Sequence, residues 1–368
     1  MKIDRVDLHV VRMPLVRTFV TSTSTRNHLD HILVAVHAGG QAGWGECAVP
    51  PNPYYCEETT ETCWHILSKF LVPAVLDWEW ERIEELVPAY AKVRRNNFAK
   101  AGLEMACWDL LARSRSMPLH QLLGGRRRQI ESGVSLGIEQ NIDQLLSLIQ
   151  QYVDEGYRRI KLKIAPGRDV EVVRQVRDRF PDIPIMVDAN SAYSLEQADL
   201  LKQLDAFDLL LIEQPLANDD IVDHALLQRQ LQTPICLDES IISAADARKA
   251  IEMESGRVIN IKVSRLGGLL EAKKVHDLCC ARNIPVWCGG MHEYGIGRAA
   301  NIAIASLPGF KMPGDISGSD KYYAVDLVDP AITAVDGLID VPDGPGLGFE
   351  PVAERIAERT VRSLTLHA

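Results

Sequence analysis

From residue 132 onward, short apolar runs rich in β-branched residues alternate with amphipathic segments whose apolar residues recur at helical spacing. This alternation predicts parallel strands joined by right-handed helical crossovers. Eight runs are strand candidates: residues 133–136, 159–164, 185–188, 209–213, 235–238, 258–262, 286–288 and 311–316. Eight strand–helix units are typical of a closed (β/α)8-type barrel, in which the chemistry lies at the carboxyl ends of the strands.

The N-terminal part of the chain does not show this repeat. Three of its runs alternate like strands, which predicts an antiparallel meander with the first strand at the sheet edge: residues 3–13, 32–37 and 41–46. Helical spacing follows in residues 57–71, 80–94 and 99–114. Together the patterns predict an α/β chain in three parts. These are an α+β capping domain at 1–125, a modified TIM barrel at 126–320, and a C-terminal segment at 321–368 that packs back on the capping domain and completes it.

Composition narrows the class of protein. Of the 368 residues, 46% are hydrophobic and 24% are charged, as in globular proteins. The 50 acidic residues outnumber the 40 basic ones, which argues against nucleic acid or an anionic membrane as the main partner. No apolar run reaches the roughly 18 residues of a membrane span, and the N-terminus lacks a signal-peptide pattern. Eight cysteines without a CxxC pair indicate a reducing compartment, so a cytoplasmic protein is expected.

Five consecutive barrel strands end in a charged residue, at positions 163, 188, 213, 238 and 262. One strand–helix unit separates each position from the next, so these side chains are expected at the same height on neighbouring strands. Lys161 shares a face with Lys163, because strand side chains alternate with a period of two. The barrel mouth therefore collects Asp188, Glu213 and Asp238, with lysines on either side.

Three carboxylates that face one another need a cation, because burying a carboxylate without a partner is costly. A ligand set made only of oxygen atoms suits a hard divalent ion, and Mg²⁺ is the natural choice. Lys163 and Lys262 then lie on opposite sides of a bound small molecule. The nearby metal and partial burial are expected to lower the pKa of these lysines, so that an amine can act as a base. Any one of these residues alone is more simply a structural ion pair, whereas the complete set indicates a catalytic site.

The motifs KLKI, MVDAN, IEQPL, CLDES, INIKVSRLGG and WCGGM…GIGRAAN resemble those of the enolase superfamily, in its muconate-lactonizing-enzyme subgroup. The likeness runs through nearly the whole chain, including GWGEC at 43–47 and PGDISGSD at 313–320. Within the subgroup, the chain is most similar to the N-succinylamino acid racemase/o-succinylbenzoate synthase family. The resemblance implies Mg²⁺-dependent removal of the proton α to a carboxylate through an enediolate, followed by racemisation, by dehydration, or by either in one site.

The resemblance also implies a role for individual residues. Asp188, Glu213 and Asp238 would ligate Mg²⁺, for which Mn²⁺ can substitute. Lys163 and Lys262 would be the acid/base pair on opposite faces of the substrate, with Lys161 tuning Lys163. The residues supporting these groups or surrounding the substrate would be Asn190, Glu239, Ser135, Met291, His292, Glu293 and Phe19. The expected partners are a small carboxylate substrate and further copies of the chain in a homo-oligomer, with no nucleic acid and no membrane.

Two positions depart from the family pattern. His292 stands where an aliphatic residue is usual and Tyr294 where a small hydroxyl residue is usual, and both are expected to change the pocket. By the same resemblance, the polar residues 18–27 form a mobile lid over the barrel mouth.

Three alternatives stay open at this point. A muconate cycloisomerase would share the lysines and the metal ligands. A dipeptide epimerase is expected to carry an Asp-x-Asp pair near the last strands for the peptide ammonium group, but Met291-His292-Glu293 stands there instead. A non-catalytic, metal-binding barrel is disfavoured, because both lysines and all three carboxylates are present together.

Overall fold

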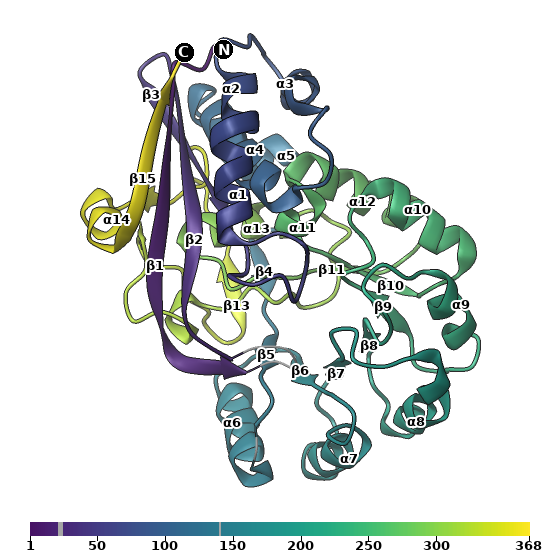
Figure 1. The fold of residues 1–368 in the computed structure, drawn as a ribbon. Helices are drawn as coiled ribbons and strands as arrows, with labels where there is room; N and C mark the ends of the chain where they lie inside the picture. Colours follow the sequence, from purple (N-terminus) through teal and green to yellow (C-terminus); the bar gives the residue numbers. More distant parts are fainter. Residues whose placement is uncertain (21–24, 140) are drawn as a thin grey trace.

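The structure, a computed structural model, describes residues 1–20, 25–139 and 141–368. Its larger part contains a curled parallel sheet with the strand order β11-β10-β9-β8-β7-β6-β5 (Figure 1). The strands are β5 Val134–Leu136, β6 Ile160–Lys163, β7 Ile185–Asp188, β8 Ile212–Glu213, β9 Ile235–Leu237, β10 Val258–Ile261 and β11 Val286–Cys288. Each strand pairs with the one that precedes it along the chain, as successive strand–helix units require, and the predicted barrel class is confirmed.

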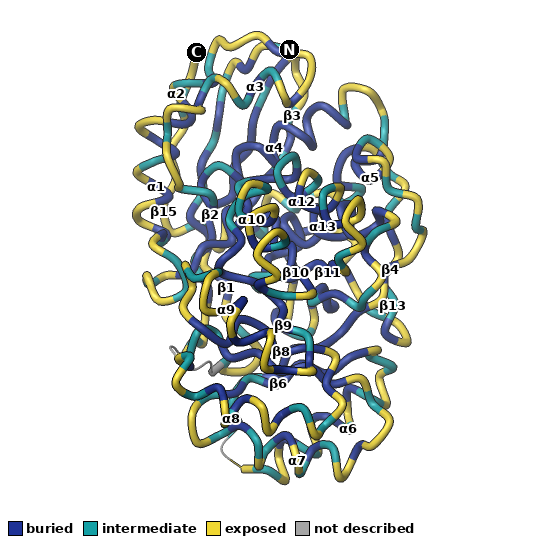
Figure 2. Tube along the Cα trace, turned by 90° about the vertical axis from the view of Figure 1, so that its right-hand side faces the viewer, coloured by how far each residue is buried: buried dark blue, intermediate teal, exposed yellow. Residues whose placement is uncertain are grey.

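Helices cover the outer face of this sheet, following its curvature from α6 to α12 in Figure 1. They are α6 Ile142–Asp154, α7 Val170–Arg179, α8 Ala198–Lys202, α9 Val222–Gln228, α10 Ala244–Met253, α12 Leu269–Ala281 and α13 Gly295–Ala305. Figure 2 shows that the trace is buried along β8 to β11, whereas α6, α7 and α8 carry exposed outer turns. In α6, for example, Leu145, Ile149 and Tyr152 form the buried stripe at helical spacing.

The prediction of an eighth strand at 311–316 is wrong. This segment and the preceding Phe310 close the ring between β11 and β5 through isolated parallel bridges, Val286 with Phe310 and Ser132 with Gly314. Pro313 has no N–H group to donate to a ladder, so a regular strand cannot continue through it. Beyond the proline, the Asp315 N–H group still donates to the carbonyl oxygen of Cys288 at 2.9 Å, which fixes the position of Asp315 at the barrel mouth.

The smaller sheet is antiparallel, with the order β15-β1-β2-β3, and its strands are Thr360–His367, Arg5–Val20, Thr25–Ala38 and Gln41–Cys47. The expectation that the first strand lies at the edge is wrong, because β15 pairs with β1 from Arg5 opposite His367 to Val11 opposite Thr360. No local pattern in the first 125 residues could show a partner from the far end of the chain. The C-terminal tail therefore completes the capping domain, as expected, and the two chain ends lie close together (Figure 1). The domain boundaries at residues 125 and 320 stay a prediction.

Short elements complete the fold. The capping helices are α1 Thr60–Ile66, α2 Val72–Val75, α3 Ile83–Tyr90, α4 Asn97–Ser114 and α5 Leu119–Leu123, with a π-helical stretch at Leu67–Leu71 between α1 and α2. Strand β4 (Gln129–Glu131) pairs with β13 (Leu338–Asp340), and β12 (Val328–Asp329) pairs with β14 (Glu350–Pro351), which precedes α14 (Ala353–Arg359). None of the helices described here combines the length and the apolar character needed to cross a lipid bilayer.

Helix α4 connects the two domains. It packs against β3 of the capping sheet and against α11 (Val263–Leu266) and α12 of the barrel. The Glu104 carboxylate accepts hydrogen bonds from the N–H groups of Leu269 and Leu270, at 2.7 and 2.9 Å, and so satisfies free donors at the start of α12. Burial raises the pKa of Glu104 to about 7, even though these hydrogen bonds favour the charged form.

We expect Glu104→Gln to change how stability depends on pH. A raised carboxyl pKa means that this group favours folding when protonated, and the contribution is lost as the pH rises through about 7. The free energy of unfolding of the variant minus that of the wild type should therefore increase by about 2 kcal/mol when the pH is raised from 5.5 to 8. Urea unfolding at the two pH values measures this difference, with Glu354→Gln on exposed α14 as a control. If the variant and the wild type differed in free energy of unfolding by the same amount at both pH values, Glu104 would not titrate in this range.

Candidate active site

The side chains at the strand ends meet in one region of the barrel mouth. Lys163, Asp188 and Glu213 close β6, β7 and β8, and the strand register places each beside the next. Asp238 follows β9 directly and Lys262 follows β10 directly. The three carboxylate residues are buried, with at most 1% of their surface exposed. The structure thus brings together the residues that the sequence spacing groups, while their chemical roles stay proposals.

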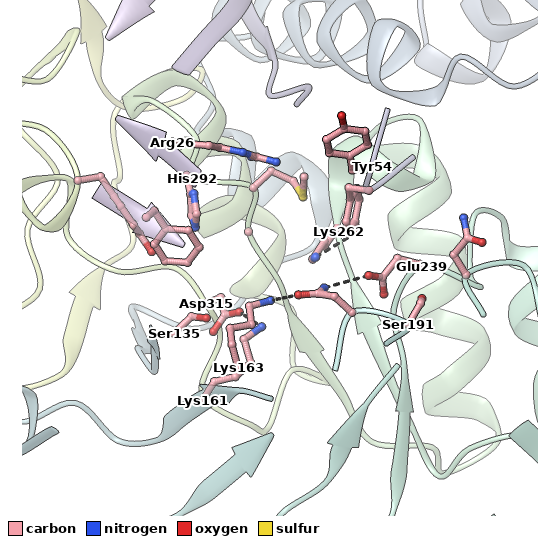
Figure 3. Close-up of a pocket in the computed structure, with 17 residues that line it drawn as sticks. Arg26, Tyr54, Ser135, Lys161, Lys163, Ser191, Glu239, Lys262, His292 and Asp315 are labelled. Atoms are coloured by element: carbon pink, nitrogen blue, oxygen red, sulfur yellow. Dashed lines mark hydrogen bonds and ion pairs between the residues drawn. The ribbon is translucent and has the colours of Figure 1, made fainter. Parts of the chain in front are cut away.

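The two flanking lysines hold different carboxylates. Lys163 Nζ lies 2.6 Å from Asp188 Oδ2 and 2.6 Å from Asn190 Oδ1. Lys262 Nζ lies 2.7 Å from Asp238 Oδ2. Strands β7, β8 and β9 separate β6 from β10, so the two amines approach the cavity from different sides, as Figure 3 shows.

Lys161 lies deeper, on the same face of β6 as Lys163. Its Nζ contacts Glu213 at 3.0 Å, Asp188 at 3.3 Å and Asp315 at 2.5 Å. Asp315 also accepts a hydrogen bond from Arg159 at 2.8 Å. Asp315 was not among the residues predicted from the sequence, although it lies next to the end of the eighth strand candidate and a charged residue at that place matches the pattern of the other strands.

Two further groups around Lys262 were also missed. Tyr55 comes from the capping domain, with its Oη 3.1 Å from Lys262 Nζ and its ring centroid 4.7 Å from the same atom. Arg265 forms an ion pair with Asp238 and donates from Nε to the Ile241 carbonyl at 2.7 Å. Arg265 lies one helical turn after Lys262, a spacing that signals proximity, whereas nothing in the sequence signals Tyr55.

The donor set fits a divalent metal ion. Within the described ranges no three His, Cys, Asp or Glu side chains are gathered as a ready-made metal cluster, because amines hold the carboxylates apart. The lysines do not compensate these carboxylates equally. Lys163 and Lys161 lower the pKa of Asp188 despite its burial, whereas burial and the neighbouring Asp188 raise the pKa of Glu213 and raise that of Glu239 to about 7. Glu239 Oε2 is buried without a hydrogen-bond partner among the described residues. Buried oxygen ligands short of a cation suit Mg²⁺.

The expected lowering of the lysine pKa values depends on a bound metal and stays a prediction. Burial lowers the pKa of Lys262, but Tyr55, Glu213 and other acidic neighbours outweigh it, so the net shift is upward. The pKa of Lys161 is also raised, because Asp315, Glu213 and Asp188 outweigh the effect of burial. At Lys161 and Lys262 the acidic side chains close to the amine therefore outweigh the effect of burial.

A cavity of about 320 Å³ opens above these groups, a size that suits a small organic molecule. Its lining includes the expected Phe19, Ser135, Lys161, Lys163, Asn190, Glu239, Lys262, Met291 and His292, together with Arg26, Tyr54, Tyr55, Ser191, Asn218, Gly290, Asp315 and Tyr322. The His292 ring lies between two aromatic rings, 4.3 Å from the Phe19 centroid and 4.7 Å from that of Tyr322.

Two residues expected at the pocket lie elsewhere. Tyr294 does not line the cavity: its buried hydroxyl lies within hydrogen-bond distance of the carbonyl oxygens of Val11 and Leu29, at 2.8 and 2.7 Å, and so ties the start of α13 to the capping sheet. The expectation that Tyr294 changes the pocket is therefore wrong. Glu293 is buried and also absent from the cavity lining. Position 292 turns toward the cavity with φ of 63°, which local sequence patterns do not show.

The lid expected at residues 18–27 is only partly described. Residues 21–24 lie outside the described residues, and the movement of the lid stays a prediction. On either side of them, Phe19 of β1 and Arg26 of β2 reach the cavity. The capping domain thus contributes directly to the wall of the site.

Both parts of the chain match known family models. Residues 5–124 match the mandelate racemase / muconate lactonizing enzyme N-terminal domain, and residues 144–355 match the enolase C-terminal domain-like family. The chain belongs to the enolase superfamily. Membership confirms the resemblance seen in its strand-end motifs, and members of this superfamily depend on Mg²⁺ for their chemistry.

Individual curated relatives and solved structures are similar to nearly the whole chain. The chain is 53% identical over 358 residues to an o-succinylbenzoate synthase of Geobacillus stearothermophilus, covering 97% of this chain and 95% of that one. It is 47% identical over 361 residues to an N-succinylamino acid racemase of Amycolatopsis sp, covering 98% of each. A solved enolase-superfamily structure from Listeria innocua Clip11262 superposes with a TM-score of 0.97 at 40% identity, covering 100% of this chain and 99% of that one.

Proposed function

We propose that this protein is a Mg²⁺-dependent enzyme that removes the proton α to a carboxylate, acting as an N-succinylamino acid racemase, an o-succinylbenzoate synthase, or both. The observation that carries this proposal is the placement of Lys163 and Lys262 on different sides of one cavity, with buried carboxylates between them. The names and high identities of the curated relatives support the same two activities.

The donor chemistry suggests that Asp188, Glu213 and Asp238 hold the metal. When bound, Mg²⁺ supplies positive charge that stabilises the negative charge developing on the substrate carboxylate. Lys163 and Lys262 then stand on opposite faces of the α-carbon, so that one amine removes a proton and the other returns one. The hydrogen bond from Asn190 Nδ2 to Glu239 Oε1, at 3.0 Å, holds the amide whose oxygen accepts from Lys163.

Racemisation and dehydration need the same first step. In racemisation, the second lysine delivers a proton to the opposite face. In the synthase reaction, Lys163 would remove the α-proton and then give it to the β-hydroxyl on the same side, whose C–O bond breaks so that it leaves as water. Lys262 would remain a cation beside the enolate face. Lys161, held by Asp315 and Glu213, supplies a fixed positive charge that tunes Lys163.

The alternatives are less well supported. Recognition of a peptide ammonium group requires free carboxylates near the last strands. Asp315 lines the cavity there, but Lys161 and Arg159 already hold its carboxylate, and Glu293 does not line the cavity. A cycloisomerase would use the same lysines, and only substrate tests separate it from the proposed activities. A binding role without catalysis leaves both lysines unexplained.

We also propose a cytoplasmic location and a homo-oligomeric state. All eight cysteines are free thiols in the structure, which supports a reducing compartment. Size-exclusion chromatography with light scattering tests the oligomer, and a monomer at micromolar concentration would contradict it.

We expect the enzyme to exchange the α-proton of an N-succinylamino acid with solvent in a metal-dependent way. Proton NMR in D₂O with Mg²⁺ and one enantiomer should show loss of the α-proton signal together with decay of optical rotation. EDTA should stop both, because the carboxylates alone cannot stabilise the developing charge, and added Mg²⁺ should restore them. A folded, metal-loaded protein that exchanges no proton would reject this substrate class, and cycloisomerase substrates would be tested next.

A further inference from the structure

One cation of the cavity takes no part in the proposed chemistry. Arg26, on β2 of the capping sheet, lines the cavity next to the segment expected to be a lid. Figure 3 shows its guanidinium extending over the cavity beside His292, on the side away from Lys161 and Lys163. Lys163 and Lys262 each form an ion pair with a carboxylate, and a counter-ion would be expected for Arg26 as well.

Within the described residues, Arg26 forms no ion pair with a carboxylate, and its Nε is buried without a hydrogen-bond partner. The two carboxylates that line the cavity are directed to other groups. Asp315 contacts Lys161 and Arg159, and Glu239 accepts from Asn190. A guanidinium that is desolvated without a counter-ion is costly, and burial lowers the pKa of Arg26 accordingly.

Other cations gather at this end of the cavity. Burial, and then chiefly Arg26 and Lys321, lower the pKa of His292 well below its usual value, so the imidazole is neutral. Its ring is fixed between Phe19 and Tyr322, and a neutral imidazole still offers one N–H donor. This wall therefore has an excess of positive charge and hydrogen-bond donors, which an anion would balance.

We propose that Arg26, assisted by His292, forms a second anion subsite that binds a carboxylate of the substrate distant from the reacting one. A guanidinium binds a carboxylate through two parallel N–H···O hydrogen bonds, which a half-buried Arg with a buried, unpartnered Nε–H can provide. The inference rests on the proposed function, because it assumes that the reacting carboxylate lies among the metal ligands and lysines. The distal carboxylate belongs either to a dicarboxylic acyl group, such as succinyl, or to an acidic amino-acid side chain.

Three substrates distinguish these two sources: N-succinylmethionine, N-acetylmethionine and N-acetylglutamate. If Arg26 binds the acyl carboxylate, Arg26→Gln should lower kcat/KM for N-succinylmethionine by roughly 100-fold and leave N-acetylmethionine within about threefold. A comparable loss of kcat/KM confined to N-acetylglutamate would also support the subsite, and would show that it binds the side-chain carboxylate of the substrate amino acid. Arg26→Lys keeps the charge without the planar fork, so it should show an intermediate loss for the same substrate.

Arg12→Gln is the matched control, because Arg12 lies on the neighbouring strand β1, pairs with Asp30 and does not line the cavity. Thermal unfolding of each variant identifies any loss of folded protein, and Arg26→Lys serves as the test if Arg26→Gln does not fold. Equal losses for all three substrates, or no loss for any, would overturn the subsite.

Calorimetric titration with the same compounds in the presence of Mg²⁺ separates this inference from the proposed function. If the wild type turns over none of the three but binds N-succinylmethionine or N-acetylglutamate at least about tenfold more tightly than N-acetylmethionine, the proposed activity fails. Loss of that preference in Arg26→Gln would then still establish the subsite. Equal affinity of the wild type for all three compounds would overturn it.

Discussion

Replacing Lys262 with alanine is expected to abolish racemisation while one enantiomer of the substrate still exchanges its α-proton with solvent. If Lys163 and Lys262 serve opposite faces of the α-carbon, each removes the proton of one enantiomer only. Lys262→Ala should therefore lower racemisation by about 10³-fold or more, and Lys163→Ala should do the same. Deuterium incorporation into each pure enantiomer, followed by NMR, should show exchange of opposite enantiomers in the two variants.

Exchange of only one enantiomer in each variant distinguishes loss of one base from a general disturbance of the active site. A variant that merely disturbs the metal ligands would lose exchange of both enantiomers together. Lys273→Ala on α12 is the control, since that lysine pairs with Asp277 away from the cavity. Retention of racemisation in either Lys163→Ala or Lys262→Ala would contradict the two-base proposal, as would exchange of the same enantiomer in both.

The carboxylates and lysines of the site could be predicted because they follow from periodicity. One strand–helix unit has a nearly constant length, so Asp188, Glu213 and Asp238 recur at a fixed interval, and parallel register then brings their side chains together. Asp315 follows the same rule, since it lies near the end of the strand candidate at 311–316, but it was not singled out. The constant interval between strand ends was therefore enough to predict the site residues that come from the barrel alone.

The remaining wall of the cavity could not be predicted in the same way. Tyr55 and Arg26 belong to the capping domain and reach the barrel mouth through domain packing, which leaves no periodic trace in the sequence. Tyr294 was expected to change the pocket because it replaces the small hydroxyl residue of the family pattern, but the backbone turns at His292 and directs Tyr294 into the domain interface. Pairing of β1 with β15 is a long-range contact of the same kind.

Gly45→Ala is expected to cost about 3 kcal/mol or more in free energy of unfolding, a large share of the 5–15 kcal/mol typical of proteins. Gly45 lies on β3 where the strand backbone touches α4: a Cβ atom there would overlap the Gly102 carbonyl oxygen and lie 2.7 Å from the Ala106 nitrogen. Both contacts are backbone, so neither can move aside like a flexible side chain. Relief requires β3 and α4 to separate, which opens the buried centre of the capping domain.

The effect should extend to the barrel mouth. The residue after Gly45, Glu46, accepts hydrogen bonds from the N–H groups of Tyr294 and Gly297, at 2.9 and 2.8 Å, and so fixes the start of α13 beside His292. Urea unfolding measures the cost, and Gly39→Ala in the adjoining turn is the matched control, because open space surrounds it and only its φ of 57° opposes a side chain. That control should lose about 1 kcal/mol. If Gly45→Ala lost no more than Gly39→Ala, the strand and helix would not be held in backbone contact, and the link from the GWGEC segment to the substrate pocket would have to pass through other residues.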